Sequence, residues 1–440
     1  MGLGSKLGQL NKATNAQVQQ ASAPLAEGGY NSNNIPTLQK PAPMTQQDST
    51  DIKTVIQGTR NDYVGKESKA LSAGLRKPNV PNGAEYPNTE VSNMIVEKMW
   101  RIVCLKELQA FFTQDELQTL VNRACRHDFR ALMATWQLPT LDMACDIAVL
   151  GLYDIVLLLD DSGSMSAMEK KENMSRYDIL KQVVKSIGFI GTLMDPDGVV
   201  VRFLNSLEEG NGMSDFASID ALMSRVGPSA GTPIGECIQQ RIFQSMVQPF
   251  LQQGSLKRPV LLITVTDGEP SNSQSVISAI STCVNEFSRS KYGRFGMAFS
   301  FAQIGSDKNA TDYLDTLDKD PHVGKCVDCT SEFSIEQTQF PGLTEQTWIL
   351  KLMIGAVDPA YDEADEQQPP PQQKYMPPMG QPTYPPMGQP TYPPMGQPAY
   401  PSMAPGTSSY QQSYQQSYQQ PYQQQYSPAP SAPPSGYPRY

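Results

Sequence analysis

The chain has little histidine and lacks the phosphate-binding motif of P-loop ATPases. Only His127 and His322 occur among its 440 residues, so a Ser-His-Asp arrangement has almost no base to draw on. The sequence contains no Gly-x4-Gly-Lys-[Ser/Thr] loop, which excludes a self-contained P-loop ATPase. We therefore predict that the protein is not an enzyme.

Long apolar runs and clustered basic residues are also missing. No segment reaches the roughly 18 consecutive apolar residues that a membrane-spanning helix needs, and the start of the chain has no apolar signal region. The formal net charge is −10 and the Lys and Arg residues are scattered, whereas phosphate binding needs clustered cations. These features predict a cytoplasmic protein with no transmembrane segment and no nucleic-acid partner.

The cysteine count favours reduced thiols. Seven cysteines are an odd number, and the chain shows no secretion signal. Cys326 and Cys329 form a lone Cys-x-x-Cys pair. A structural zinc site needs about two further ligands, and the scarcity of histidine leaves few candidates. We therefore predict two thiols on a late strand.

Apolar residues concentrate in the middle of the chain, so we expect one folded region between two tails. Residues 1–88 contain much Gln, Asn and Pro and are predicted to be a disordered arm. Residues 89–149 show helical apolar spacing, with a capping box that begins at Thr113, and predict a helical segment that packs on or precedes the core. Residues 150–358 are predicted to fold as one domain, and residues 359–440 to be a disordered tail rich in Pro, Gln, Tyr and Met.

Continuously apolar runs alternate with helix-like segments in the predicted domain. Apolar runs bounded by polar loops are typical of strands buried on both faces of a parallel sheet. Strands that alternate with helices indicate crossover connections. The predicted fold class is α/β, a Rossmann-like domain with a mainly parallel central sheet and helices on both faces. The predicted strands are 153–160, 199–204, 260–265 and 297–304, and the predicted helices are 177–193, 219–226, 234–251 and 275–287.

Three polar loops in this domain contain hydroxyl and carboxylate side chains. The first has an Asp-x-Ser-x-Ser pattern, the second reads Gly-Thr-Pro and the third Thr-Asp-Gly. Taken singly, they are ordinary turns or helix caps. Together they place oxygens at the carboxyl edge of one sheet, where ligands of such sheets bind. The oxygen-bearing residues are Asp160, Ser162, Ser164, Thr232 and Asp267.

With these three loops in this order, the chain resembles the von Willebrand factor A (vWA) domain family. The metal-ion-dependent adhesion site (MIDAS) of that family reads Asp-x-Ser-x-Ser, then Thr, then Asp, and all five positions match. The resemblance covers about 200 residues, nearly half of the chain. Without disulfides or a signal peptide, the chain is similar to the intracellular eukaryotic members. The resemblance implies that residues 150–358 are a vWA domain with a complete MIDAS.

The five matching residues imply a divalent cation. Mg²⁺ prefers about six oxygen ligands, and Mn²⁺ accepts the same donors. Three of the five side chains are neutral hydroxyls, which leave the cation incompletely neutralised and open to a carboxylate from outside. We therefore expect a cation-dependent interaction module that binds an Asp or Glu of a protein partner. In some family members the metal moves the last helix, here near 343–354. A Mg²⁺-dependent phosphatase that uses Asp160 stays open as an alternative.

The C-terminal tail supports a different hypothesis. Residues 379–386 recur from Met387 and, altered, from Met395, and Tyr-Gln-Gln repeats follow over 410–426. This composition is typical of an extended linker, and its spaced tyrosines and prolines also suit the grooves of peptide-binding domains. Within it, Pro430-Ser431-Ala432-Pro433 resembles a tetrapeptide that recruits sorting machinery. The alternative function is a scaffold or condensate component in which the vWA domain is structural.

Overall fold

A six-stranded sheet forms the centre of the protein. The computed structural model describes residues 63–361 except 64, 87, 196 and 341. The strand order is β5-β4-β1-β6-β7-β8, with β5 antiparallel to β4 and every other pair parallel. The strands are β1 (Asp154–Leu159), β4 (Val199–Phe203), β5 (Gly210–Met213), β6 (Val260–Thr266), β7 (Met297–Gln303) and β8 (Val327–Thr330).

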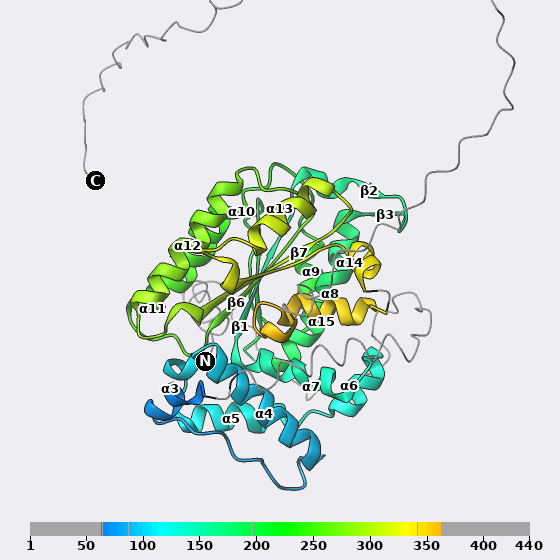
Figure 1. Cartoon of the computed structure of the whole chain (residues 1–440). Helices are drawn as coiled ribbons and strands as arrows, with labels where there is room; N and C mark the ends of the chain where they lie inside the picture. The colour runs from blue at the N-terminus through cyan, green and yellow to red at the C-terminus, as the bar shows by residue number, and fades with distance from the viewer. Residues whose placement is uncertain (1–62, 64, 87, 196, 341, 362–440) are drawn as a thin grey trace, which may run out of the picture. The chain divides into compact units, whose positions relative to one another are not determined.

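Helices cover both faces of this sheet. Figure 1 shows α12 (Ser273–Arg289) and α11 (Gln248–Gln252) on one side of the strands, and α8 (Arg176–Met194) and α15 (Glu345–Ile354) on the other. β1, β4, β6 and β7 are buried along their whole length, which agrees with their mostly apolar sequences. The predicted α/β class, with a mainly parallel sheet between layers of helices, is confirmed.

The connecting helices differ from the prediction in detail. The predicted helix 234–251 consists of α10 (Ile234–Glu236), a π-helical stretch η5 (Cys237–Val247) and α11. Pro249 in α11 lacks the N–H that regular α-helical bonding requires, which fits the wider turns before it. Two further helices, α13 (Lys308–Asp318) and α14 (Phe333–Gln339), and the edge strand β5 were not predicted, and α9 covers Phe216–Met223.

A layer of helices precedes β1. Figure 1 shows it at the end of the sheet from which β1 starts. The capping box predicted at the start of α5 is confirmed, because the Glu116 N–H donates to Thr113 Oγ1 (3.2 Å) and the Thr113 N–H donates to Glu116 Oε2 (2.9 Å). The elements of the layer are α4 (Thr89–Leu105), η2 (Leu108–Phe111), α5 (Gln114–Ala124), α6 (Phe129–Trp136), α7 (Leu141–Asp146) and η3 (Ile147–Leu152).

Buried polar contacts join this helical layer to the chain that follows α15. Arg101 of α4 pairs with Asp358 at 2.6 Å, and both side chains are buried. The Tyr361 hydroxyl donates to Asp146 Oδ2 of α7 at 2.8 Å. The predicted domain end at 358 is therefore wrong. Residues 359–361 belong to the folded part, because Ala360 and Tyr361 are buried and Tyr361 bonds to the helical layer.

The described part of the predicted arm also contains folded structure. α3 covers Glu67–Ser72, and the side chains of Ala70 and Leu75 are buried. The indole N–H of Trp100 in α4 donates to Glu67 Oε1 at 2.8 Å. The predicted boundary at 88 is therefore wrong, because a few apolar residues are enough to dock this short helix on α4. The polar composition of the arm as a whole hides them.

The rest of the predicted arm and tail, including Pro430-Ser431-Ala432-Pro433, lies outside the described residues. Within the described part, no helix is long and apolar enough to cross a membrane. The seven cysteines are thiols. Cys326 ends a short 3-10 turn, η7 (Gly324–Cys326), and Cys329 lies in β8, so the Cys-x-x-Cys pair is at a late strand as predicted.

Gly235 allows α10 to pack closely against α12, and this contact fixes the loop that contains Thr232. A Cβ at Gly235 would lie 2.3 Å from Ser275 Oγ and 2.6 Å from the Val276 backbone nitrogen. We expect Gly235→Ala to lower the free energy of unfolding by about 1–3 kcal/mol, as overpacking does, in urea denaturation. Gly227→Ala is the control, since a Cβ there meets nothing within 4 Å. Equal stability of the two variants would contradict the close packing.

Candidate metal centre

The first predicted loop leaves β1 at the carboxyl edge of the sheet, beside the end of β6. Leu159 pairs with Val265, so Asp160 and Thr266 follow at neighbouring positions. Asp160 is fully buried. Its Oδ1 accepts from the Ser162 backbone N–H (2.7 Å), and its Oδ2 accepts from the Thr266 hydroxyl (2.6 Å). These two hydrogen bonds fix the orientation of the Asp160 carboxyl.

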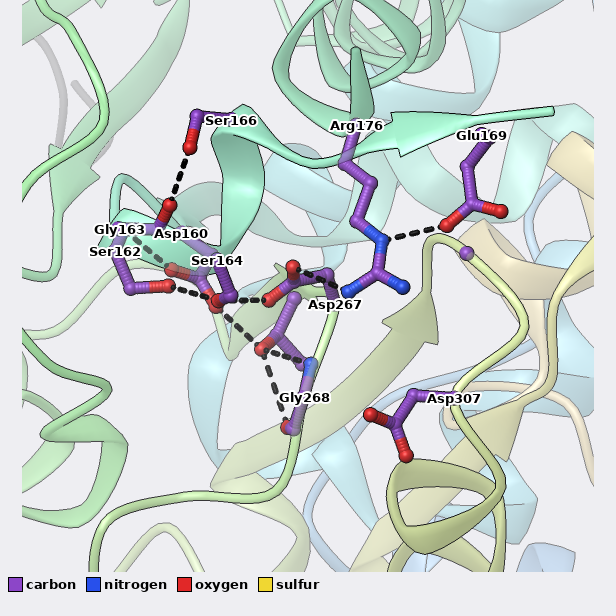
Figure 2. Close-up of polar contacts among 12 residues, drawn as sticks. Asp160, Ser162, Gly163, Ser164, Ser166, Glu169, Arg176, Asp267, Gly268 and Asp307 are labelled. Carbon is purple, nitrogen blue, oxygen red and sulfur yellow. Dashed lines mark hydrogen bonds and ion pairs between the residues drawn. The ribbon is translucent and has the colours of Figure 1, made fainter.

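Next to this carboxyl lies an oxygen chain, formed by Ser162, Ser164 and Asp267 (Figure 2). The Ser162 and Ser164 hydroxyls are 2.9 Å apart, and Ser164 Oγ donates to Asp267 Oδ1 at 2.8 Å. Ser162 and Asp267 are buried, whereas Ser164 is exposed to solvent. The structure thus brings together four of the five predicted ligands, and one of them faces the outside.

Thr232, the fifth predicted ligand, lies in a neighbouring loop. A backbone hydrogen bond from Gly163 N–H to Ala230 O (3.0 Å) joins this loop to the first one. Thr232 is half-buried, and its backbone N–H donates to Ser271 Oγ at 3.1 Å. Within the described part of the chain, no hydrogen bond joins the Thr232 hydroxyl to the other four residues. The structure therefore brings the Thr232 loop to the site and does not place its hydroxyl in the oxygen chain.

Asp161 follows Asp160 but has a structural role. Its Oδ1 accepts from the Asn205 backbone N–H and its Oδ2 from the Ser206 backbone N–H, both at 2.8 Å. Its backbone oxygen accepts from the Ser229 N–H at 2.7 Å. Asp161 thereby holds the loop after β4 and the loop before α10 against the first loop. Of the two adjacent aspartates, only Asp160 faces the oxygen chain.

The donor set suits a hard divalent cation. Adjacent ligands at about 2.0–2.1 Å from an octahedral Mg²⁺ lie about 2.9 Å apart, and the neighbouring oxygens of Ser162, Ser164 and Asp267 have this spacing. Oxygen donors favour Mg²⁺ and Mn²⁺ over metals that prefer sulfur or imidazole ligands. Among residues that the structure describes, no cluster of three or more His, Cys, Asp and Glu side chains could hold a metal ion, so a cation at this edge would depend on the serine and threonine hydroxyls as well.

Arg176, at the start of α8, lies against the same site and was not predicted. Its Nη1 donates to Asp267 Oδ2 (2.9 Å) and its Nε donates to Glu169 Oε1 (2.6 Å). Figure 2 shows the guanidinium between the two carboxylates. Glu169 belongs to a small antiparallel hairpin of β2 (Met168–Glu169) and β3 (Met174–Ser175). No sequence signal marks these contacts, because they depend on how the hairpin folds over the sheet edge.

Burial raises the pKa of Asp160 to about 6, although hydrogen bonds from Ser162 and Thr266 oppose the shift. A buried carboxyl favours its protonated form, because the charged form loses its hydration. The unfolded value is about 3.9, so the folded protein holds more protons than the unfolded chain between about pH 4 and pH 6. The contribution of Asp160 to stability therefore falls as the pH rises through this window.

Asp160→Asn removes this titration. In protein freed of divalent cations, we expect the stability of the wild type relative to Asp160→Asn to fall by up to about 3 kcal/mol from about pH 4 to pH 6 and then to level off. Thermal unfolding followed by circular dichroism measures the difference. Asp312→Asn, which removes an exposed carboxylate, is the control. Parallel pH profiles of the two variants would contradict the raised pKa.

Comparison with known proteins finds a likeness in structure and none in sequence. No family model matches the chain, and no curated protein sequence matches it. Among solved structures, the manganese-loaded TRAP protein of Plasmodium vivax is similar, with 15% identity and a TM-score of 0.28 over 46% of this chain and 74% of that chain. The interpretation of the site therefore rests on the residues of this chain.

Proposed function

We propose that the protein is a divalent-cation-dependent protein-interaction module. In this proposal Asp160, Ser162, Ser164, Thr232 and Asp267 hold Mg²⁺ or Mn²⁺, and an acidic group of a partner protein completes the site. The observation that carries the proposal is the oxygen chain, whose members lie 2.9 and 2.8 Å apart at one edge of the sheet. The same residues stand at the MIDAS positions of the vWA family, which the sequence resembles.

The charges around the oxygen chain favour a carboxylate as the outside ligand. Of the five proposed ligands, only Asp160 and Asp267 are carboxylates, and Arg176 forms an ion pair with Asp267. A dication held there keeps positive character, and the exposed Ser164 marks the side from which a ligand can approach. When bound, the cation supplies attraction and orientation for that ligand. Asp or Glu side chains of a protein partner have the matching charge.

We further propose that the site binds and does not catalyse. His127 lies between α5 and α6, and His322 follows α13, so neither histidine adjoins the oxygen chain. The hydrogen-bond neighbours of the Ser162 and Ser164 hydroxyls in this chain are oxygens that would themselves hold the cation, so no separate general base activates a nucleophile. The phosphatase alternative requires Mg²⁺-dependent turnover of phosphate esters, and we expect none.

Ser164→Ala tests the oxygen chain against a matched neighbour, Ser166→Ala. Ser164 bonds to Ser162 and Asp267, whereas Ser166 Oγ donates to the Gly163 carbonyl at 2.7 Å (Figure 2). We expect Ser164→Ala to weaken Mg²⁺ binding at least about tenfold, or about 1.4 kcal/mol, in calorimetric titration. Ser166→Ala should bind like the wild type. Equal affinities of the two variants would argue against a cation at this place.

Asp160→Ala tests the binding of a partner. We expect the wild type to capture an acidic protein in the presence of Mg²⁺ and to release it in EDTA, and Asp160→Ala not to capture it. Thr232→Val, which removes only the hydroxyl of the fifth proposed ligand, should weaken capture in the same direction, and Ser166→Ala should preserve it. Exchange of the contacting Glu or Asp of the partner for its amide should abolish capture. Capture that survives both EDTA and Asp160→Ala would refute the proposal.

A further inference from the structure

The guanidinium of Arg176 is bonded to a carboxylate that the proposed cation uses. Its Nη1 donates to Asp267 Oδ2 at 2.9 Å, while Ser164 donates to the other oxygen, Oδ1, at 2.8 Å. The Asp267 side chain is fully buried, and that of Arg176 is 16% exposed. One oxygen of Asp267 thus faces the oxygen chain, and the other faces a positive charge that belongs to the protein itself.

Two positive charges that share one buried carboxylate oppose each other. Because the Asp267 side chain is sealed from water, solvent screens the repulsion between the guanidinium and a cation at the oxygen chain only weakly. Arg176 cannot escape this repulsion by losing a proton, because a guanidinium stays charged at any pH at which the protein is folded. The charge of Arg176 therefore lowers the affinity of the site for a cation.

Arg176 has a second carboxylate partner, Glu169, which keeps its charge paired when Asp267 binds the cation. Arg176 Nε donates to Glu169 Oε1 at 2.6 Å. Gly305 lies directly against this pair, with a φ of +77°, and a Cβ there would lie 2.7 Å from both Arg176 Nε and Glu169 Oε1. Because Gly305 has no side chain, the Arg176–Glu169 pair can pack directly against its backbone. Arg176 can therefore give up Asp267 without becoming an isolated buried charge.

We propose that Arg176 is a built-in competitor of the divalent cation. It neutralises Asp267 in the cation-free protein and weakens cation binding, so that the cation is held firmly only when a carboxylate of the partner adds its negative charge. This inference rests on the proposed function of the site. By linkage, each of the two ligands then raises the affinity for the other. Between partners, the domain stays folded and is largely free of the cation.

Arg176→Gln removes the charge and keeps a hydrogen-bonding side chain. We expect it to tighten Mg²⁺ binding about tenfold, or about 1.4 kcal/mol, in titration with MgCl₂. We also expect it to lower the melting temperature in EDTA, because the buried Asp267 loses its partner. Arg130→Gln is the control, since Arg130 pairs with Glu90 (2.9 Å) on the exposed surface of the helical layer. It should leave the Mg²⁺ affinity unchanged.

If Arg176 competes with the cation, Arg176→Gln binds Mg²⁺ more tightly and is less stable without it. If Arg176 only positions Asp267, Arg176→Gln loses both Mg²⁺ affinity and stability. Weaker or unchanged Mg²⁺ binding by Arg176→Gln would overturn this inference alone. Absence of Mg²⁺ and Mn²⁺ binding by the wild type and Arg176→Gln alike would overturn the proposed function with it. Arg176→Met, which also removes the charge and keeps a long side chain, should raise the affinity in the same direction. If Arg176→Gln does not fold, this second variant shows whether loss of the charge raises the Mg²⁺ affinity. An unchanged or weaker Mg²⁺ affinity then overturns the inference.

Discussion

The parallel strands β1 and β6 end next to each other at the carboxyl edge of the sheet, and the rest of the site depends on this constraint. The pairing of β1 with β6 continues to Leu159 and Val265, so the residues after both strands emerge side by side. Since both strands are buried on both faces, the residues that follow them directly are still inside the core. For this reason Asp160 and Asp267 are fully buried although they belong to loops.

Two buried carboxylates at one edge require compensation, and the protein provides it in two ways. Asp160 receives hydrogen bonds from neutral donors, Ser162 and Thr266, and burial keeps its pKa near 6. Asp267 instead receives the guanidinium of Arg176. A buried charge without a partner costs several kcal/mol, so the polar groups around this edge are needed even when no cation is bound. In the proposed function, a divalent cation would add a further positive charge beside these two carboxylates.

The sequence predicted those features that neighbours along the chain determine. Apolar runs predicted β1 and β6, and two short motifs predicted that Asp160 and Asp267 lie at one edge. Arg176 was missed because its contact with Asp267 depends on how α8 and the β2–β3 hairpin cross the sheet edge, which no local pattern contains. The edge strand β5 was missed because two of its four residues, Gly210 and Gly212, are glycine, which weakens any strand signal.

The two halves of α15 are packed differently. In its C-terminal half, the Leu352 carbonyl accepts from the buried Ser300 hydroxyl, and leaving such a group unpaired costs about 1–3 kcal/mol. Its N-terminal half, with Trp348, lines a cavity of about 180 Å³ whose wall includes Glu169. The N-terminal half of α15 therefore has free space beside it, whereas a buried hydrogen bond fixes the C-terminal half. Because Glu169 also accepts a hydrogen bond from Arg176, and Arg176 donates to Asp267, these three residues connect the oxygen chain with the wall of the cavity beside α15.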